Sequence, residues 1–342
     1  MKRFNLLITA GLLLLMLPVG SCMKYGPSQT ETFLPGPAGE GMFIINEGNF
    51  MYANASLTYY IPGSGKTENE VFIRANGINL GDVAQSMSIY GDNGYIVVNN
   101  SGVIFVIDPD TFRLKGSITG LISPRYIHFI DARKAYVTDL YQEKITIVDP
   151  QAFRISGHIP TPGHRSTEKM VQWENYVFVT CWSYDNKILV IDTATDRITD
   201  SLEVGHQPTD LVLDRNGKIW CAAAGNLYRI DARSRNIEKI FPLRADGART
   251  HLALNAFSDT LYYLNKSLWR MAINQATTGN TPFIVLDDRP YYGLAVDPVS
   301  SDIYVADALD YVQPGKVYRF NPGGEPVDTL TTGINPGSFC FK

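Results

Sequence analysis

A strand-and-turn motif recurs along the chain about every 40 residues, and a repeat of this length restricts the possible folds more than any other feature of the sequence. Its copies are Val106-Ile107-Asp108, Ile147-Val148-Asp149, Val190-Ile191-Asp192, Arg229-Ile230-Asp231 and the weaker Arg319-Phe320-Asn321. The four aspartates are 41, 43 and 39 residues apart. Asp or Asn suits the first position of a tight turn, so each copy predicts a strand that enters a turn.

Further strand-like runs accompany each copy of the motif. Runs rich in β-branched and aromatic residues occur at residues 42–45, 95–98, 135–138, 176–179, 218–221, 260–263 and 302–305. Such composition is typical of strands. An alternating apolar stretch comes before each run except the one at residues 42–45, and another strand-like stretch follows most turns. Four short antiparallel strands in a unit of about 40 residues form the blade of a β-propeller.

The number of blades follows from the first strand of each unit. First strands are predicted near residues 89, 129, 173, 213, 254 and 296, and a seventh at residues 337–341. The run at residues 42–45 lacks a first strand, so the C-terminal strand is expected to complete blade one and leave no free edge at the closure. The sequence thus predicts an all-β, seven-bladed propeller of four-stranded antiparallel blades over residues 41–342. An open all-β array, or six blades with an irregular insert, is the alternative, because residues 267–286 lack the aspartate turn.

Residues 1–21 have the pattern of a bacterial export signal. Lys2 and Arg3 precede an apolar run at residues 6–19, which is shorter than the roughly 20 residues of an ordinary transmembrane helix. The run ends in Val19-Gly20-Ser21-Cys22, which resembles a lipobox and implies lipidation of Cys22. Cleavage without lipidation is the alternative. Residues 22–40 contain several Pro and Gly residues and are expected to form a flexible tether.

Composition excludes some classes of protein. A hydrophobic content of 45% with 19% charged residues rules out a disordered chain, and a net charge of −4 offers no basic footprint for a nucleic-acid partner. Cys181, Cys221 and Cys340 have no metal-ligand spacing and lie in strand-like runs, so they are expected to be small buried residues. No metal site and no required cofactor are predicted.

One face of a propeller carries the loops between second and third strands and the loops between blades. At these positions the sequence places aromatic side chains and planar hydrogen-bond donors, which should converge on one mouth and bind a large ligand. The candidate ligand-binding residues are Asn49, Phe50, Asn100, Arg125, Tyr126, Tyr141, Arg165, Trp182, Tyr184, Arg249, Tyr291, Tyr292 and Tyr311. For any one of the aromatic residues, packing between blades is the alternative.

No catalytic residues are predicted. The chain has five histidines, without HxH or HExxH spacing, and it lacks a GxSxG motif, a P-loop and a dinucleotide fingerprint. His128 alternates with apolar residues on a predicted first strand and is expected to be structural. His164, His206 and His251 lie at three successive junctions between blades, and this is the one arrangement that could converge on a metal ion or a substrate.

The blades resemble the YVTN-type (YncE-like) propeller repeat, for example at Tyr136-Val137-Thr138 and Val190-Ile191-Asp192-Thr193. A narrower resemblance lies in Ile45-Asn46-Glu47-Gly48-Asn49-Phe50, Cys181-Trp182-Ser183-Tyr184-Asp185 and Gly205-His206-Gln207-Pro208. Together with the lipobox, these segments are similar to the surface-exposed lipoprotein propellers of Bacteroidota, among them the BtuG-like cobalamin-binding proteins.

The resemblance implies a lipid-anchored protein on the outer membrane, exposed at the cell surface. It further implies that the mouth binds a corrinoid (cobalamin, vitamin B12) as a transported ligand and delivers it to a TonB-dependent transporter, without catalysis. Two other classes stay open. One is a propeller lyase or lactonase, which needs a metal ion or a His–Glu pair at the mouth, and the other is a glycan-binding or assembly component of an uptake system.

Replacement of the predicted lipidation site tests the anchor. We expect Cys22→Ala to move the protein from the membrane fraction to the soluble fraction, because one acyl-bearing cysteine is the only predicted attachment. Fractionation followed by immunoblotting measures this. Retention of the Cys22→Ala variant on membranes would contradict the lipobox interpretation, and protease treatment of intact cells reports which face is exposed.

Overall fold

The computed structural model describes residues 41–243 and 249–342. The predicted signal at 1–21, the predicted lipidation site Cys22 and the predicted tether at 22–40 lie outside these residues. Within the described part, none of the helices combines the length and the apolar character needed to cross a membrane.

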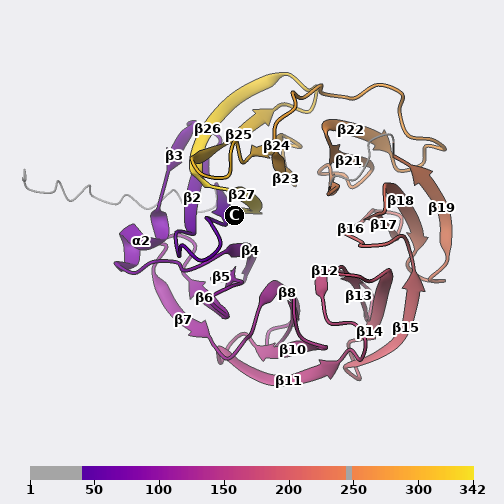
Figure 1. Cartoon of the computed structure of the whole chain (residues 1–342), viewed down its shortest axis with the longest axis horizontal. Helices are drawn as coiled ribbons and strands as arrows, with labels where there is room; N and C mark the ends of the chain where they lie inside the picture. Colours follow the sequence, from indigo (N-terminus) through magenta and orange to yellow (C-terminus); the bar gives the residue numbers. More distant parts are fainter. Residues whose placement is uncertain (1–40, 244–248) are drawn as a thin grey trace, which may run out of the picture. The chain divides into compact units, whose positions relative to one another are not determined.

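Seven antiparallel sheets are arranged around a central axis, which confirms the predicted seven-bladed propeller (Figure 1). The innermost strands, from blade one to blade seven, are β27 (Pro336–Phe341), β4 (Ala84–Tyr90), β8 (Pro124–Asp131), β12 (Thr167–Trp173), β16 (Asp210–Leu213), β20 (His251–Leu254) and β23 (Tyr291–Val296). The second strands are β1 (Met42–Asn46), β5 (Asn93–Val98), β9 (Lys134–Asp139), β13 (Tyr176–Cys181), β17 (Lys218–Ala223), β21 (Thr260–Asn265) and β24 (Ile303–Asp307).

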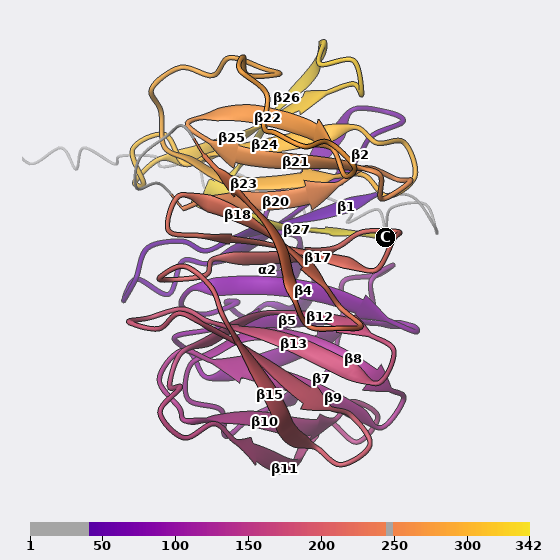
Figure 2. The ribbon, with the colours of Figure 1, turned by 90° about the vertical axis from the view of Figure 1, so that its right-hand side faces the viewer.

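The outer half of each blade completes the sheet. The third strands are β2 (Ser56–Ile61), β6 (Val103–Ile107), β10 (Lys144–Asp149), β14 (Lys187–Asp192), β18 (Asn226–Asp231), β22 (Ser267–Ala272) and β25 (Pro314–Phe320). The fourth strands are β3 (Lys66–Glu68), β7 (Leu114–Ile118), β11 (Arg154–Pro160), β15 (Arg197–Glu203), β19 (Ile237–Pro242) and β26 (Pro326–Ile334), and α2 (Val71–Asn76) lies in the connection from blade one to blade two. Seen from the side, the connecting loops lie on two opposite faces of the ring (Figure 2).

The core lies between blades. Each second strand is covered on both sides by neighbouring sheets, and every residue of β1 and of β24 is buried. One typical cluster joins Phe178 and Val190 of blade four to Ile219 and Ile230 of blade five. Strands buried on both faces need continuous apolar runs, and this explains the runs of β-branched and aromatic residues at the second strands.

The repeated aspartates build the turns between third and fourth strands. The Asp108 carboxylate accepts hydrogen bonds from the backbone N–H groups of Asp110 at 3.0 Å and Thr111 at 2.9 Å, and Asp149 does the same for the two equivalent residues of blade three. A carboxylate that satisfies the turn's own N–H groups favours the turn over other conformations. These aspartates therefore have a structural role, as their uniform spacing indicated.

The three cysteines of the described residues are buried and free. Burial raises the pKa of the Cys340 thiol to about 12, and it also raises the pKa values of the Cys181 and Cys221 thiols. This confirms the prediction that they pack as small buried residues.

Blade six departs from the common pattern. Its sheet has three strands, β20, β21 and β22, and the fourth position holds only a single bridge between Leu268 and Ile284. The Arg270 guanidinium lies over the Phe283 ring, 3.7 Å from its centre, so this segment still covers the edge of β22. Without an aspartate turn, the chain after β22 leaves the sheet and returns as a loop.

The C-terminal strand closes the ring as predicted. β27 pairs antiparallel with β1, from Phe341 opposite Met42 to Pro336 opposite Asn46. Phe339 and Phe341 pack in the cluster formed by Met42, Tyr304 and other residues of blades one and seven. β27 also contacts β23 and β4, the innermost strands on either side of it.

Deletion of Pro336–Lys342 tests this closure. Truncation of one core aromatic residue costs about 3–5 kcal/mol, so we expect loss of two partly buried rings and a strand to lower the free energy of unfolding by several kcal/mol or to cause aggregation. Thermal and denaturant unfolding measure this, with Val299→Ser, at an exposed turn position, as the control. An unchanged Tm after the deletion would mean that blade one is completed by another segment.

Candidate functional site

A belt of polar side chains surrounds a cavity of about 90 Å³ at the centre of the ring. Every blade contributes to it: the lining includes Glu47, Gln85, Tyr126, Lys169, Asp210, Arg249, His251 and Tyr292, which we call the polar belt. Most of these residues lie at or near the beginning of an innermost strand. Those strands begin at the loops between blades, so the belt lies toward the face that carries these loops. A concave site where several polar groups converge is a typical ligand-binding site.

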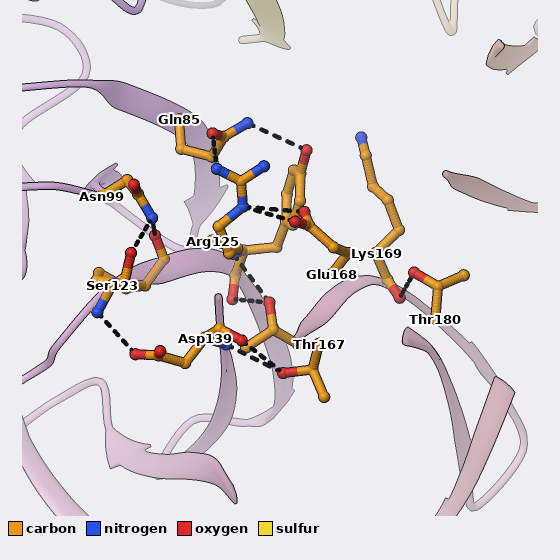
Figure 3. A network of polar contacts seen from close by, with 12 residues as sticks. Gln85, Asn99, Ser123, Arg125, Asp139, Thr167, Glu168, Lys169 and Thr180 are labelled. Atoms are coloured by element: carbon orange, nitrogen blue, oxygen red, sulfur yellow. Dashed lines mark hydrogen bonds and ion pairs between the residues drawn. The ribbon is translucent and has the colours of Figure 1, made fainter. Parts of the chain in front are cut away.

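A buried ion pair supports the belt between blades three and four. The Arg125 Nε donates to both carboxylate oxygens of Glu168, at 2.9 and 3.0 Å, and its Nη1 donates to Gln85 (Figure 3). The exposed fractions are 7% for Arg125 and 1% for Glu168. Burial lowers the pKa of Arg125, but the Glu168 charge more than offsets this, so the guanidinium stays charged. Arg125 therefore holds three blades together behind the cavity.

A second chain of hydrogen bonds lies below this ion pair. The Asn99 amide donates to the Ser123 hydroxyl at 2.8 Å, and the Ser123 N–H donates to Asp139 at 2.8 Å (Figure 3). The Asp139 N–H donates to the Thr167 hydroxyl at 3.1 Å, and the other Asp139 carboxylate oxygen accepts from the Tyr141 N–H at 2.8 Å. Blades two, three and four are thus joined by buried polar contacts that also position the loop of Tyr141.

Glu47 and Tyr292 face the cavity from blades one and seven. The Tyr292 hydroxyl donates to a Glu47 carboxylate oxygen at 2.9 Å. Burial raises the pKa of Glu47 and outweighs the lowering effect of this hydrogen bond and of the Arg125 and Arg249 charges. Burial, together with the Glu47 charge, also raises the pKa of Tyr292. Glu47 is thus a carboxyl group that takes up a proton at a higher pH than an exposed glutamate does.

Three nitrogen-bearing side chains of the belt keep donor capacity for a ligand. The Lys169 ammonium lies 3.8 Å from an Asp210 carboxylate oxygen and 4.5 Å from the centre of the Tyr126 ring. Within residues 41–243 and 249–342, Arg249 makes no hydrogen bond or ion pair, and it faces the cavity. Burial, and then the Arg249 and Lys169 charges, lower the pKa of His251 well below its ordinary value, so its imidazole is neutral.

Exposed aromatic side chains stand around the mouth above the belt. Their loops join second to third strands, and we call them the aromatic rim: Phe50, Tyr52, Tyr141, Tyr184 and Tyr311. Their exposed fractions run from 44% for Tyr311 to 91% for Tyr184, high values for large rings. Tyr311 meets Tyr292 edge to face with ring centres 5.9 Å apart, and this contact connects the rim to the cavity wall. Apolar groups of this size gathered on one face indicate an interaction surface.

The structure brings many of the predicted ligand-binding residues to this mouth. Tyr126, Arg249 and Tyr292 line the cavity, and Phe50, Tyr141, Tyr184 and Tyr311 form most of the rim. Asn49 and Asn100 hold loops instead: Asn49 bonds the Tyr311 carbonyl at 2.5 Å, and Asn100 bonds the Asp82 carboxylate at 2.6 Å. Arg165 is exposed on the loop from blade three to blade four, and Trp182 is half-buried.

Tyr291 lies apart from the cavity wall, although it is next to Tyr292 on the same strand, β23. Its hydroxyl donates to Asp287 at 2.6 Å, and its ring packs against Tyr318 and Arg289. Adjacent residues of a strand point to opposite faces of its sheet, so Tyr291 packs against the cluster between blades six and seven, while Tyr292 lies toward Glu47 of blade one.

Sequence reasoning missed five of the eight residues of the belt. Glu47, Gln85, Lys169, Asp210 and His251 were not among the predicted binding residues. Their common signal is a polar residue at or beside the start of a first strand, repeated in successive units.

The three junction histidines do not converge, because His251 lines the cavity, His164 bonds Asp185 at 2.7 Å, and His206 is exposed. His128 bonds Gln172 at 3.0 Å, consistent with a structural role.

The profile of the family described as "Domain of unknown function (DUF5074)" matches residues 40–334. The chain belongs to the DUF5074 family. A search of curated proteins found no match. The family match covers all seven blades except for the closing strand, so the family's domain corresponds to the propeller.

Solved structures share the fold at low sequence identity. A quinonprotein alcohol dehydrogenase-like protein from Bacteroides thetaiotaomicron aligns with a TM-score of 0.70 and 14% identity, over 88% of this chain and 78% of that one. A 6-phosphogluconolactonase-like protein from Bacteroides fragilis aligns with a TM-score of 0.67 and 11% identity, over 90% and 99%. Hydrazine synthase of Kuenenia stuttgartiensis aligns with a TM-score of 0.62 and 13% identity, over 75% and 89%. Identities this low show a shared propeller fold.

Glu168→Gln tests the importance of the buried ion pair. We expect it to lower the free energy of unfolding by about 3–5 kcal/mol, because Arg125 would remain buried and charged without its partner. Glu174→Gln is the matched control: Glu174 pairs with Arg233 at 3.3 Å on the surface, and an exposed pair contributes about 1 kcal/mol or less. Denaturant unfolding of both variants measures the difference, and equal losses would contradict a stabilising role for the belt's ion pair.

Proposed function

We propose that this protein is a non-catalytic capture protein that binds a corrinoid at the mouth of the propeller. The observation that carries the proposal is the polar belt, with uncommitted donors, beneath an aromatic rim on the same face. The resemblance to BtuG-like lipoproteins supplies the ligand class. In this proposal the protein is anchored through Cys22 at the outer-membrane surface and passes cobalamin to a TonB-dependent transporter.

The chemistry of the ligand matches that of the mouth. A corrinoid is wide and rigid, with apolar ring faces and a fringe of amide groups. Arg249, Lys169 and Gln85 carry donors for amide oxygens, and the aromatic rim offers rings to cover apolar faces. Each amide left unpaired in a dry interface costs about 1–3 kcal/mol, so complete pairing gives specificity. A mouth held by a closed ring loses little entropy on binding.

Two tyrosines of the rim lie at turn positions with a left-handed backbone. Tyr184 and Tyr311 have positive φ values of 59° and 63°. A residue with a Cβ in the left-handed region is strained by about 1–2 kcal/mol, and glycine or asparagine is preferred there. The same conformation occurs at other turn residues such as Phe112 and Phe153, so the feature that favours a contact with a partner molecule is the exposure of the Tyr184 ring, at 91%.

A lactonase-type or lyase-type enzyme is the second candidate. Glu47 and His251 line the same cavity, one with a raised and the other with a lowered pKa, and such pairs serve as acid and base in enzymes. The likeness to a 6-phosphogluconolactonase-like protein rests on 11% identity. If the wild-type protein hydrolyses a lactone and the His251→Gln variant does not, an enzyme is favoured over simple capture.

Calorimetric titration of the purified protein with cyanocobalamin tests the main proposal. We expect one binding event in the wild type and an affinity at least about thirtyfold lower for Trp182→Ala, since loss of an aromatic anchor costs about 2 kcal/mol or more. Arg249→Gln should weaken binding as well, because it removes a charged donor that has no hydrogen-bond or ion-pair partner among residues 41–243 and 249–342.

Controls separate the ligand class from the position of the site. Arg233 lies in the turn between β18 and β19, on the face opposite the mouth, and its side chain is 77% exposed. We therefore expect Arg233→Gln to bind cyanocobalamin like the wild type. Absence of heat with the wild type would overturn the corrinoid proposal. Wild-type affinity in both Trp182→Ala and Arg249→Gln would remove the mouth as the binding site, even if the protein binds cobalamin.

A further inference from the structure

We propose that His164, Cys181 and Asp185 form a metal site for Zn²⁺ at the rim of blade four, separate from the polar belt. One donor atom of each residue lies within 4.8 Å of the other two. Cys181 is fully buried at the end of β13, and the side chains of His164 and Asp185 are 25% and 13% exposed. The proposal is independent of the corrinoid function, because none of the three residues lines the central cavity.

The segments that carry the three residues are held in place by backbone hydrogen bonds. His164 N–H donates to the Thr161 carbonyl at 2.9 Å, closing a turn after β11. Asp185 accepts at one carboxylate oxygen from Asn186 N–H at 2.7 Å and Lys187 N–H at 3.1 Å, which leaves the other oxygen for His164 at 2.7 Å. The three donors are thus presented together by a fixed backbone, and small side-chain rotations are enough to adjust them.

The donor set is that of a zinc site. Imidazole nitrogen, thiolate sulfur and carboxylate oxygen bind Zn²⁺ at about 2.0–2.3 Å in a tetrahedron, where donor atoms are about 3.3–3.6 Å apart. The ion would separate the His164 and Asp185 atoms and draw the most distant donors together by roughly 1 Å. On binding, the Cys181 thiol loses its proton to solvent as the S–Zn bond forms. Thiolate and carboxylate then balance the two positive charges, leaving a neutral buried centre.

Among the described residues, a buried hydroxyl close to the cluster in the chain's fold has no hydrogen-bond partner. Ser166 is 1% exposed, and its Oγ makes no hydrogen bond to any residue of the described ranges. Its carbonyl accepts the Trp182 N–H at 2.7 Å, so Ser166 lies next to the residue that follows Cys181. A buried unsatisfied hydroxyl costs about 1–3 kcal/mol, and a metal-bound water molecule is a partner that would satisfy it. This water would also fill the fourth position of the ion.

An ion at this place would join two connections on the ligand-binding face. His164 comes from the loop between blades three and four, whereas Cys181 and Asp185 flank the loop that carries Trp182 and Tyr184. Coordination would therefore fix the rim loop of blade four to the neighbouring connection. In this proposal the ion holds the two connections together, and ligand capture at the mouth requires no reaction at the ion.

Metal binding by the purified, chelator-treated protein tests the site. After addition of Zn²⁺ and gel filtration, we expect about one equivalent of zinc per chain and a higher Tm than in the metal-free protein. Co²⁺ in place of Zn²⁺ should give a thiolate-to-metal charge-transfer absorption. Cys181→Ser should abolish this absorption, and His164→Gln and Asp185→Asn should each weaken zinc binding by at least about tenfold, since even second-shell changes cost this much.

Matched variants make the test specific. Cys221→Ser replaces another fully buried cysteine, one blade further on, and His206→Gln replaces the exposed histidine of the next junction. Both should bind zinc and cobalt like the wild type. Asp185→Asn can keep the two backbone hydrogen bonds that Oδ1 accepts. Weaker zinc binding in this variant would therefore report the loss of a metal-binding oxygen, not a change in the loop. The proposal is overturned if the wild type retains no zinc, or if the cobalt absorption persists in Cys181→Ser.

Discussion

The pairing of the last strand with the first determines whether the seven blades form a ring at all. The antiparallel pairing of β27 with β1 brings residues almost 300 positions apart in the chain into one sheet. Phe341 lies opposite Met42, and Pro336 lies opposite Asn46. The chain continues from β26 of blade seven into β27 of blade one, so one segment spans the junction. Ring closure removes the exposed sheet edges that an open array would carry. It also fixes how far apart the innermost strands stand, and therefore the width of the central cavity.

Closure makes it possible to bury charges at the centre. An isolated charge in the interior is strongly unfavourable, so each buried group needs a partner. Arg125 finds Glu168 on the next blade, Tyr292 finds Glu47 across the closure, and Lys169 lies near Asp210. These contacts link neighbouring blades in pairs around the ring. Arg249 is the exception among the charged groups lining the cavity within the described residues, and a ligand that brings an acceptor would complete the belt.

Much of the fold was predictable because its signals are local. Asp108 and its repeats satisfy N–H groups two and three residues further on, and the runs of the second strands reflect burial on both sides. The site was predictable only in part. Tyr292 and Tyr291 are adjacent and alike, yet one faces the cavity and the other packs against Tyr318. Arg125 has the residue type expected of a ligand contact, but its charge is committed to Glu168, and no pattern in the sequence links the two.

The blades can be inferred from the amino-acid sequence alone: their period, their number, their turns and the strand that closes them. Each of these depends on interactions between residues near one another in the chain, or on the simple need to pair an edge. Which polar groups meet depends on how the seven blades pack around the axis. The belt takes one or two residues from each unit of about 40 residues, and the cluster of His164, Cys181 and Asp185 combines two loops from different blades. Such convergence depends on strand parity, on loop paths and on the distance across the closed ring, and these are properties of the assembled domain.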